Sequence, residues 1–198
     1  MQYQDRIVCF LDILGFRAHI SQSLNADGSD SPEKIGHLSE ALNRIREILE
    51  IDHPTDRPEA EITQFSDSIV ISFLSGVESG VFDSLLSILW VQISLVLRGI
   101  LCRGGITRGR LIHTPTQLFG PAMVDAYALE SRAALYPRVI LDESIITAGM
   151  EAHARHHLPK HEQESIVSML RKDGDGMYYI NYVTGAQSEL DDPERSPQ

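Results

Sequence analysis

Two aspartates stand inside apolar segments, where a carboxylate is costly. Asp12 interrupts "IVCFLDILGF" (7–16) and Asp67 interrupts "QFSDSIVISF" (64–73). A charged group in an apolar strand is unfavourable unless a cation meets it. If the two segments are neighbours in a sheet, both carboxylates can face a hard divalent cation, which needs only one or two protein carboxylates plus substrate phosphates. Aspartates that cap their own turns have the same spacing, so the spacing leaves both interpretations open.

Cationic side chains gather in one glycine-rich segment, "RGGITRG" (103–109). Arg103, Arg108 and Arg110 flank its glycines in a chain that is otherwise acidic. Glycine inside a strand indicates the close approach of a ligand or of another backbone, and the planar guanidinium group suits phosphate oxygens. A strand bulge with solvated arginines is the alternative interpretation.

The elements that must position these residues follow from apolar periodicity. We predict strands over 6–14, 61–73 (a hairpin), 99–113, 138–143 and 176–184, and helices over 33–50, 80–97, 121–135 and most of 143–171. A mixed order that includes a hairpin predicts an α+β fold, a mixed sheet with helices packed on it. Residues 1–184 are expected to form a single domain, and the polar residues 185–198 a flexible tail.

Composition excludes several classes of function. The formal net charge of −11 disfavours broad binding to nucleic acid or to anionic membranes. The longest apolar run (85–97) is too short to span a bilayer and contains Gln92, so no membrane insertion is expected. Cys9 and Cys102 fit reduced core thiols. With no basic-then-apolar leader at the N-terminus, a cytoplasmic location is expected.

In order along the chain, five segments resemble the class III nucleotide cyclase catalytic domain. The resembling segments are "FLDILGF" (10–16), "QFSDSIVISF" (64–73), "RGGITRG" (103–109), "MVDAYALESRAALYPRVILDE" (123–143) and "LRKDGDGMYYIN" (170–181). They are similar to the family's first strand, the hairpin with its second metal-binding aspartate, its Arg-x-Gly-Ile-x-x-Gly strand, its Val-Asn helix with the next strand, and its basic turn. The resemblance implies a ferredoxin-like mixed sheet and an active site at a homodimer interface.

The resemblance also implies a reaction. Asp12, Ile13 and Asp67 would bind two divalent cations, Mg²⁺ or Mn²⁺, and the ribose 3′-hydroxyl of a nucleoside triphosphate would attack the α-phosphorus. A 3′,5′-cyclic nucleotide and pyrophosphate would form. Two metal ions can stabilise both the attacking and the leaving oxygen of such a displacement, and cationic side chains offset the charge that grows on the phosphates. Arg103 and Arg132 are the cations expected to be catalytic.

Departures from the family concern the transition state and the base. Asp125 and Leu129 occupy the places of the family's Asn and Arg, and leucine cannot stabilise a phosphate. Arg132, one turn further on, or Arg103 or Arg108 would have to substitute. Thr63 stands where adenine-specific members have a lysine and guanine-specific members an acid, and the partner position falls near Gln117 or Leu118. A pocket without these charges is poorly matched to either purine.

The segments "RGGIT", "GPAMVDAYALE" and "YPRVILD" look most like the bacterial Pycsar pyrimidine cyclases. That resemblance implies a pyrimidine triphosphate as substrate, with UTP favoured over CTP, and a cyclic product (cUMP, or next cCMP) that activates a separate effector protein in antiphage defence. The residues expected to contact the substrate are Phe16, Thr63, Arg108, Asp125, Tyr127 and Lys172.

Two other functions remain open from the sequence. A conventional adenylate or guanylate cyclase with an unusual base pocket is one, and a catalytically degenerate nucleotide-binding module is the other. The histidines 153, 156, 157 and 161 resemble a metal cluster, but Pro159 breaks their helical spacing, which favours a solvated segment. For His113 the alternatives are approach to the phosphates and a strand-end role, and Glu130 could contact the base or the ribose.

Overall fold

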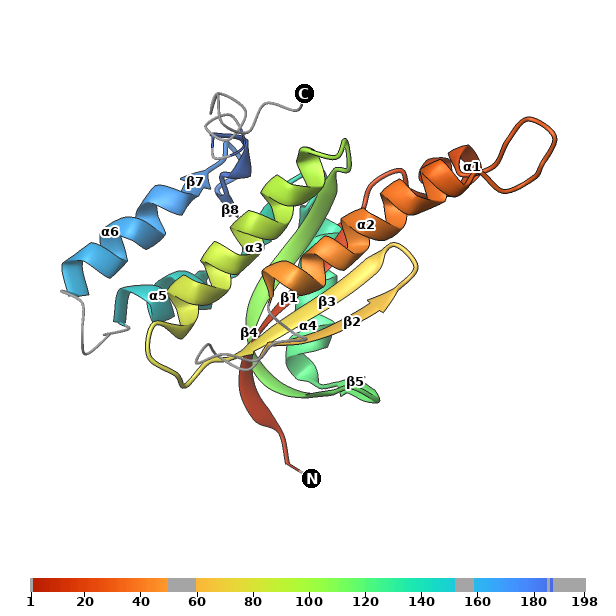
Figure 1. Cartoon of the computed structure of the whole chain (residues 1–198). Coiled ribbons are helices and arrows are strands. Elements are labelled where there is room, and N and C mark those ends of the chain that lie inside the picture. The colour runs from red at the N-terminus through yellow and green to blue at the C-terminus, as the bar shows by residue number, and fades with distance from the viewer. Residues whose placement is uncertain (1, 50–59, 152–158, 185, 187–198) are drawn as a thin grey trace.

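A single sheet of eight strands organises the computed structural model, which describes residues 2–49, 60–151, 159–184 and 186 (Figure 1). The sheet order is β2-β3-β1-β4-β6-β8-β7, and β5 pairs with β4. The strands are β1 (Gln4–Ile13), β2 (Glu61–Phe65), β3 (Ser68–Leu74), β4 (Cys102–Thr114), β5 (Gln117–Phe119), β6 (Val139–Leu141), β7 (Leu170–Lys172) and β8 (Tyr178–Ile180). Paired strands are antiparallel, except that β4 and β6 run parallel.

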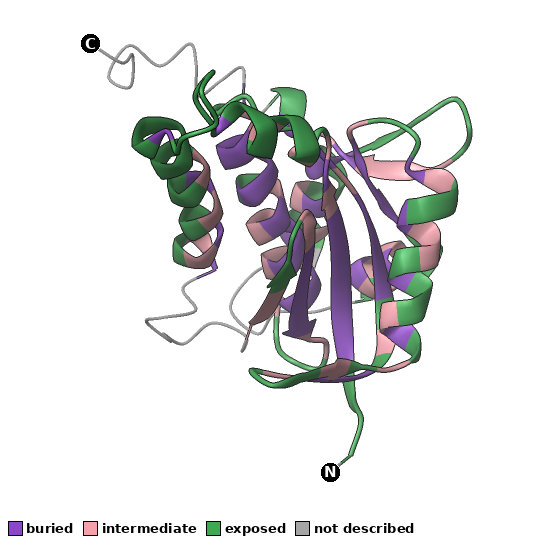
Figure 2. Cartoon of the chain, turned by 90° about the vertical axis from the view of Figure 1, so that its right-hand side faces the viewer, coloured by how far each residue is buried: buried purple, intermediate pink, exposed green. Residues whose placement is uncertain are grey.

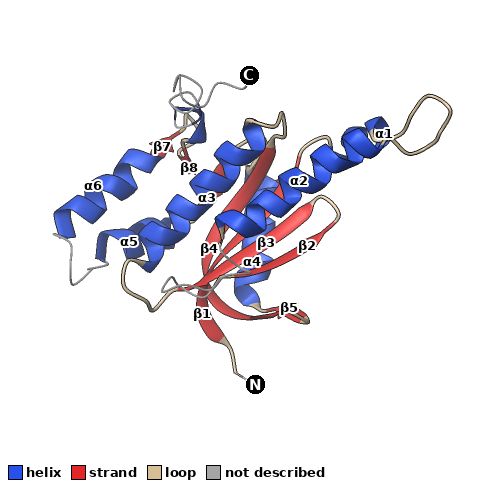
Figure 3. Cartoon of the chain, viewed as in Figure 1, coloured by secondary structure: helices blue, strands red, loops and turns tan. Residues whose placement is uncertain are grey.

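Helices cover both faces of this sheet. They are α1 (Phe16–Gln22), α2 (Pro32–Ile48), α3 (Gly80–Val96), α4 (Pro121–Ala133), α5 (Glu143–Glu151) and α6 (Pro159–Met169). The main core joins one face of the sheet to α2, α3, α5 and α6, and a smaller core joins the other face to α4. Figures 1 and 3 show α2 and α3 in front of the sheet and α4 behind it. The predicted α+β fold is confirmed.

The central strand β1 explains the apolar run at the start of the chain. Ile7, Cys9 and Leu11 point into the main core, while Val8 and Phe10 point toward α4. A strand buried on both faces is apolar at nearly every position, and the buried residues are concentrated on the central strands in Figure 2. Asp12 has the same parity as Val8 and Phe10, so it lies on the α4 face of the sheet.

Several predicted boundaries are wrong. β4 begins at Cys102, not at residue 99, and the helix predicted to reach residue 171 ends at Met169, where β7 follows directly. The final strand is only three residues long, and residues 182–184 are helical instead. β5 and β7 were not predicted. No helix in the described ranges is long and apolar enough to cross a membrane.

The glycine pair of β4 permits a close approach on both of its sides. A Cβ on Gly104 would lie 2.5 Å from the carbonyl oxygen of Phe10 in β1. A Cβ on Gly105 would lie 2.7 Å from the carbonyl oxygen of Ala126 and 3.0 Å from the amide nitrogen of Glu130, both in α4. The helix therefore rests directly on the backbone of β4.

We predict that Gly105→Ala lowers the free energy of unfolding by about 1–3 kcal/mol, because the new methyl group meets the backbone of α4 and not a movable side chain. Urea unfolding measures this change. Gly109→Ala is the matched control on the same strand face, since its Cβ would meet only the Ala122 methyl, at 3.4 Å. Equal stability of the two variants would contradict the close packing of α4.

Candidate functional site

The two aspartates singled out in the sequence meet at one end of the sheet. Asp12 lies opposite Ser68 in the antiparallel pairing of β1 with β3, and Asp67 is the residue just before Ser68. The amide of Ile13 donates a hydrogen bond to the carbonyl oxygen of Asp67 at 2.9 Å. Both side chains are half-buried, and no described residue donates a hydrogen bond to the Asp67 carboxylate. Neither aspartate is a simple turn cap.

Arg103 meets Asp12 from the neighbouring strand. The two residues are directly paired across β1 and β4, and Arg103 Nε donates to Asp12 Oδ2 at 3.1 Å. The same Nε lies 2.8 Å from Oε1 of Glu130, which reaches down from α4. Because the single Nε–H points at Asp12, Glu130 Oε1 accepts no hydrogen bond although it is buried. We call Asp12, Arg103 and Glu130 the charged triad.

Glu130 is the member of the triad whose role the sequence did not reveal. Its side chain is 3% exposed. Burial raises the pKa of the Glu130 carboxyl, the Arg103 guanidinium partly offsets that rise, and the charge of Asp12 adds to it. Beside the triad, the rings of Phe10 and Tyr127 pack edge to face with centroids 5.3 Å apart. This contact joins the triad side of α4 to β1.

The donor chemistry at this end of the sheet fits hard divalent cations. Asp12 and Asp67 offer oxygen ligands only, and Mg²⁺ keeps several waters and substrate oxygens when it binds few carboxylates. The Ile13 side chain is buried in the main core, so only its carbonyl oxygen could take part. The described ranges hold no group of three or more His, Cys, Asp or Glu side chains that could enclose a metal alone.

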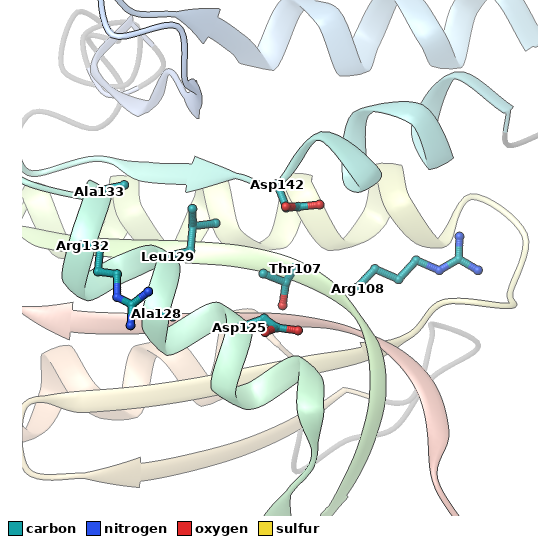
Figure 4. A pocket seen from close by; sticks show the side chains of 8 residues that line it. All are labelled: Thr107, Arg108, Asp125, Ala128, Leu129, Arg132, Ala133 and Asp142. Atoms are coloured by element: carbon teal, nitrogen blue, oxygen red, sulfur yellow. The ribbon is translucent and has the colours of Figure 1, made fainter.

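A pocket of about 400 Å³ opens on the other side of α4 (Figure 4). Thr107 and Arg108 of β4 and Asp142, just after β6, form one wall. The α4 wall consists of Asp125, Ala128, Leu129, Arg132 and Ala133. The pocket thus lies over the β4–β6 side of the sheet, whereas Asp12 and Asp67 lie over β1 and the β2–β3 turn.

Four residues singled out in the sequence share this pocket: Arg108, Asp125, Leu129 and Arg132. Arg132 is exposed and makes no ion pair with any described residue, so its guanidinium is available to an anion. Arg108 Nη2 donates to Asp5 Oδ2 at 2.7 Å. Leu129 and Arg132 line one cavity, and the substitution of Arg132 for the missing arginine stays a prediction. Asp142 was not predicted; only its place at a strand end could have indicated it.

Other residues singled out in the sequence lie apart from this pocket. Phe16 packs against the main core, on the opposite face from α4. Lys172 pairs with Tyr178, which pairs with the core residue Leu141, so the register places Lys172 on the main-core face, with its ammonium 5.0 Å from the Tyr178 ring. His161 is exposed; the other three histidines of that segment lie outside the described residues.

Thr63 belongs to a second polar network on the α4 face. His113 Nε2 lies 3.0 Å from Thr63 Oγ1, and His113 Nδ1 lies 2.8 Å from Ser72 Oγ. Arg6 Nε donates to Ser72 Oγ at 2.8 Å. Arg6, Ser72 and His113 are 2%, 0% and 4% exposed, respectively. His113 is therefore a buried hydrogen-bonded group; the sequence left its role open and did not indicate Arg6 or Ser72.

Comparison with solved structures identifies the fold. The chain superposes on the adenylyl cyclase CyaB from P. aeruginosa with a TM-score of 0.60 at 16% identity, covering 90% of this chain and 94% of that one. The superposition on the guanylyl cyclase Cya2 has a TM-score of 0.56 at 15% identity and covers 91% of this chain and 93% of that one. The superposition on a class III adenylyl cyclase-like ATP-binding protein from Pseudomonas aeruginosa has a TM-score of 0.55 at 11% identity. It covers 83% of this chain and 40% of that one. No family model and no curated protein matches the sequence. The chain has the fold of class III cyclase domains.

The buried His113 makes stability depend on pH. Burial, together with the charge of Arg6, lowers the pKa of His113 from 6.5 to about 4. Since the folded state favours the neutral imidazole, the contribution of His113 to the free energy of unfolding is fully present above pH 6.5. It is lost as the pH falls toward 4, because the unfolded state takes up the proton first. We predict that the wild type loses about 3 kcal/mol more of its free energy of unfolding between pH 7 and pH 4 than His113→Gln does. Denaturant titrations at both pH values measure the difference, and parallel losses would refute the shift.

Proposed function

We propose that the chain is a metal-dependent nucleotide cyclase that converts a pyrimidine nucleoside triphosphate into its 3′,5′-cyclic monophosphate and pyrophosphate. One observation carries the proposal. Asp12 and Asp67 come together at one end of a class III cyclase fold, and cationic side chains stand beside them in the triad and across α4 in the pocket. The resemblance to pyrimidine cyclases favours UTP, with cUMP as product, and CTP next.

Different residues of the chain would have different roles in this reaction. The 3′-oxygen bonds to the α-phosphorus, the bond from that phosphorus to the pyrophosphate oxygen breaks, and the hydroxyl proton passes to solvent. Asp12, Asp67 and the Ile13 carbonyl would hold two divalent cations, which supply Lewis-acid polarisation of the phosphates when bound. Asp12 and Glu130 hold Arg103 in place, and Arg132 would offset charge that grows on the leaving phosphates. Arg108 would have to leave its ion pair with Asp5 to do the same.

A homodimer follows from the division of the site. In one chain the carboxylate pair and the pocket lie on opposite sides of α4, so one copy does not surround a triphosphate. A second copy that docks its carboxylates against the first copy's pocket would complete two shared sites. Large apolar side chains are exposed near the carboxylate pair and on the helix that borders the pocket. They are Phe65 in the β2–β3 hairpin (82% exposed), and Val124 and Tyr127 on α4. These residues support the proposed contact between copies.

The proposed pyrimidine preference depends on uncharged side chains. Thr63 and either Gln117 or Leu118 stand where the family has the charged residues that read purines. Tyr127 and Asp125 are exposed on α4, where a nucleoside could contact them. The Pycsar-like segments extend the proposal to biology, in which the cyclic nucleotide is the second messenger of antiphage defence and acts on a separate effector protein.

Leu129 favours a second candidate function. It lies in the pocket where the family has its transition-state arginine, and one protein with this fold is described as a class III adenylyl cyclase-like ATP-binding protein. A domain that binds a nucleotide without turning it over would tolerate leucine there. A conventional adenylate or guanylate cyclase is distinguished from a pyrimidine cyclase by its product.

Product analysis tests the proposal. We expect purified protein, supplied with Mn²⁺ and all four nucleoside triphosphates, to form cUMP or, next, cCMP, detected by mass spectrometry. Cyclic AMP or cyclic GMP would contradict the pyrimidine assignment. If no product forms, we would repeat the assay in extracts of phage-infected cells; absence of product there as well would favour the binding module.

We predict that Asp12→Ala lowers cyclic nucleotide formation by at least a hundredfold, because it removes a carboxylate of the metal-binding pair, while the circular dichroism spectrum stays that of the wild type. Glu47→Ala is the control, since it removes an exposed carboxylate from α2 on the opposite face of the sheet. Normal activity of Asp12→Ala would refute the assignment of Asp12 as a metal ligand.

A further inference from the structure

A chain of four hydrogen-bonded side chains crosses the α4 face and ends at a partly exposed hydroxyl group. It runs from Arg6 on β1 through Ser72 on β3 and His113 on β4 to Thr63 on β2. We call these residues the hydroxyl relay. Only Thr63 is reachable from solvent.

The direction of the relay is set at Arg6. A guanidinium group only donates hydrogen bonds, so Ser72 Oγ must accept the bond from Arg6 Nε. The remaining partner of Ser72 Oγ among the described residues is His113 Nδ1. A buried hydroxyl hydrogen without an acceptor is costly. Ser72 therefore donates to Nδ1, and Nδ1 carries no proton.

The same logic extends through the imidazole ring. A neutral histidine without a proton on Nδ1 carries it on Nε2. His113 Nε2 therefore donates to Thr63 Oγ1 across 3.0 Å. Burial and the charge of Arg6, which lower the His113 pKa, agree with a neutral ring. Thr63 Oγ1 is left with its own hydrogen, and no described residue accepts it.

The surroundings of Thr63 suit a planar ring. Thr63 pairs with Val70, and Val70 pairs with Phe10, so the three residues form one row on the α4 face. Phe10 contacts the ring of Tyr127, which is 53% exposed. Thr63 and the Tyr127 ring therefore border one row, with Val70 and Phe10 between them. A nucleoside that spans this row could accept a hydrogen bond from the hydroxyl and stack on the ring.

We infer that His113 is a positioning residue that holds the Thr63 hydroxyl as a hydrogen-bond donor to a carbonyl oxygen of the substrate's pyrimidine base. The inference rests on the proposed function and adds a base contact of defined polarity. Uracil carries carbonyl oxygens at its 2 and 4 positions, whereas cytosine carries one at position 2 and an amino group at position 4. A donor facing position 4 favours UTP, and a donor facing position 2 serves both bases.

The first test reads the tautomer without nucleotide or turnover. Nitrogen NMR of the full-length ¹⁵N-labelled protein distinguishes a protonated Nε2 from a protonated Nδ1, and the His113→Gln spectrum assigns the signal among the 8 histidines. We expect Nε2 to be protonated at pH 7 and Nδ1 to be bare. A protonated Nδ1 would overturn the inference.

The second test compares kcat/KM for UTP and for CTP in matched pairs of variants. Thr63→Val removes the donor and should lower kcat/KM for UTP by roughly three- to tenfold. Thr63→Ser keeps the hydroxyl, so its kcat/KM for UTP should stay that of the wild type. His113→Gln places an amide N–H near the position of Nε2 and should keep kcat/KM for UTP near the wild-type value. The side chain of His113→Asn is too short to reach Thr63, so kcat/KM for UTP should fall. A merely structural histidine would not show this difference between amides.

The outcomes separate the inference from the proposed function. If kcat/KM of Thr63→Val falls only for UTP, the 4-oxygen of the base is the acceptor of the Thr63 hydrogen bond. If it falls equally for UTP and CTP, the 2-oxygen is the acceptor; both results support the contact. Unchanged kcat/KM in Thr63→Val for both substrates overturns it even if cUMP is formed. A wild type that makes no cyclic pyrimidine nucleotide, either purified or in extracts of phage-infected cells, overturns the proposed function and the inference that rests on it, whatever tautomer NMR finds.

Discussion

The direct contact of α4 with the backbone of β4 is the constraint on which the candidate site depends. Gly105 has no side chain, so the carbonyl of Ala126 and the amide of Glu130 come close to the strand. That approach brings the Glu130 carboxylate to the Arg103 guanidinium. It also turns Leu129 and Arg132 to the pocket on the far side of the helix. One missing Cβ thus aligns two groups of functional side chains.

Among the described residues, the charges beside α4 do not balance. Asp12 and Glu130 approach Arg103, and Asp67 adds a third carboxyl group at the same end of the sheet. Two carboxyl groups, those of Asp12 and Glu130, meet one guanidinium in a half-buried region, where an additional cation is favourable when both are ionised. On the other side of α4, Arg132 has no anionic partner among the described residues. The electrostatics thus favour a cation at one half-site and an anion at the other.

Two polar groups share the α4 face and are separated by apolar residues. The charged triad lies at the Asp12 end of β1, and the hydroxyl relay begins at Arg6, near its other end. Val8, Phe10 and Val70 lie between them in the smaller core. Buried polar groups of this kind are stable only when each donor finds an acceptor. The relay meets that condition except at Thr63, where a donor faces solvent.

Local pattern was sufficient to predict the long elements. Apolar periodicity predicted the long helices α2, α3 and α4 and the strands β1 and β4, because each buries a face over many residues. It also singled out Asp12, Asp67 and the arginines of the glycine-rich segment as candidates for the chemistry, since charges in apolar strands need partners, but it left turn caps and solvated arginines open as alternatives.

Which residues meet was decided only by the tertiary structure. The pairing of Arg103 with Asp12 depends on the register of β1 with β4, and the approach of Glu130 depends on where α4 crosses the sheet. Arg6, the hairpin residues Thr63 and Ser72, and His113 come from three distant segments and lie on four different strands, so no local spacing relates all four. The short strands β5 and β7 exist because a neighbouring strand pairs with them. Local sequence determines what each segment can bury, but contact between distant segments depends on the packing of the whole sheet.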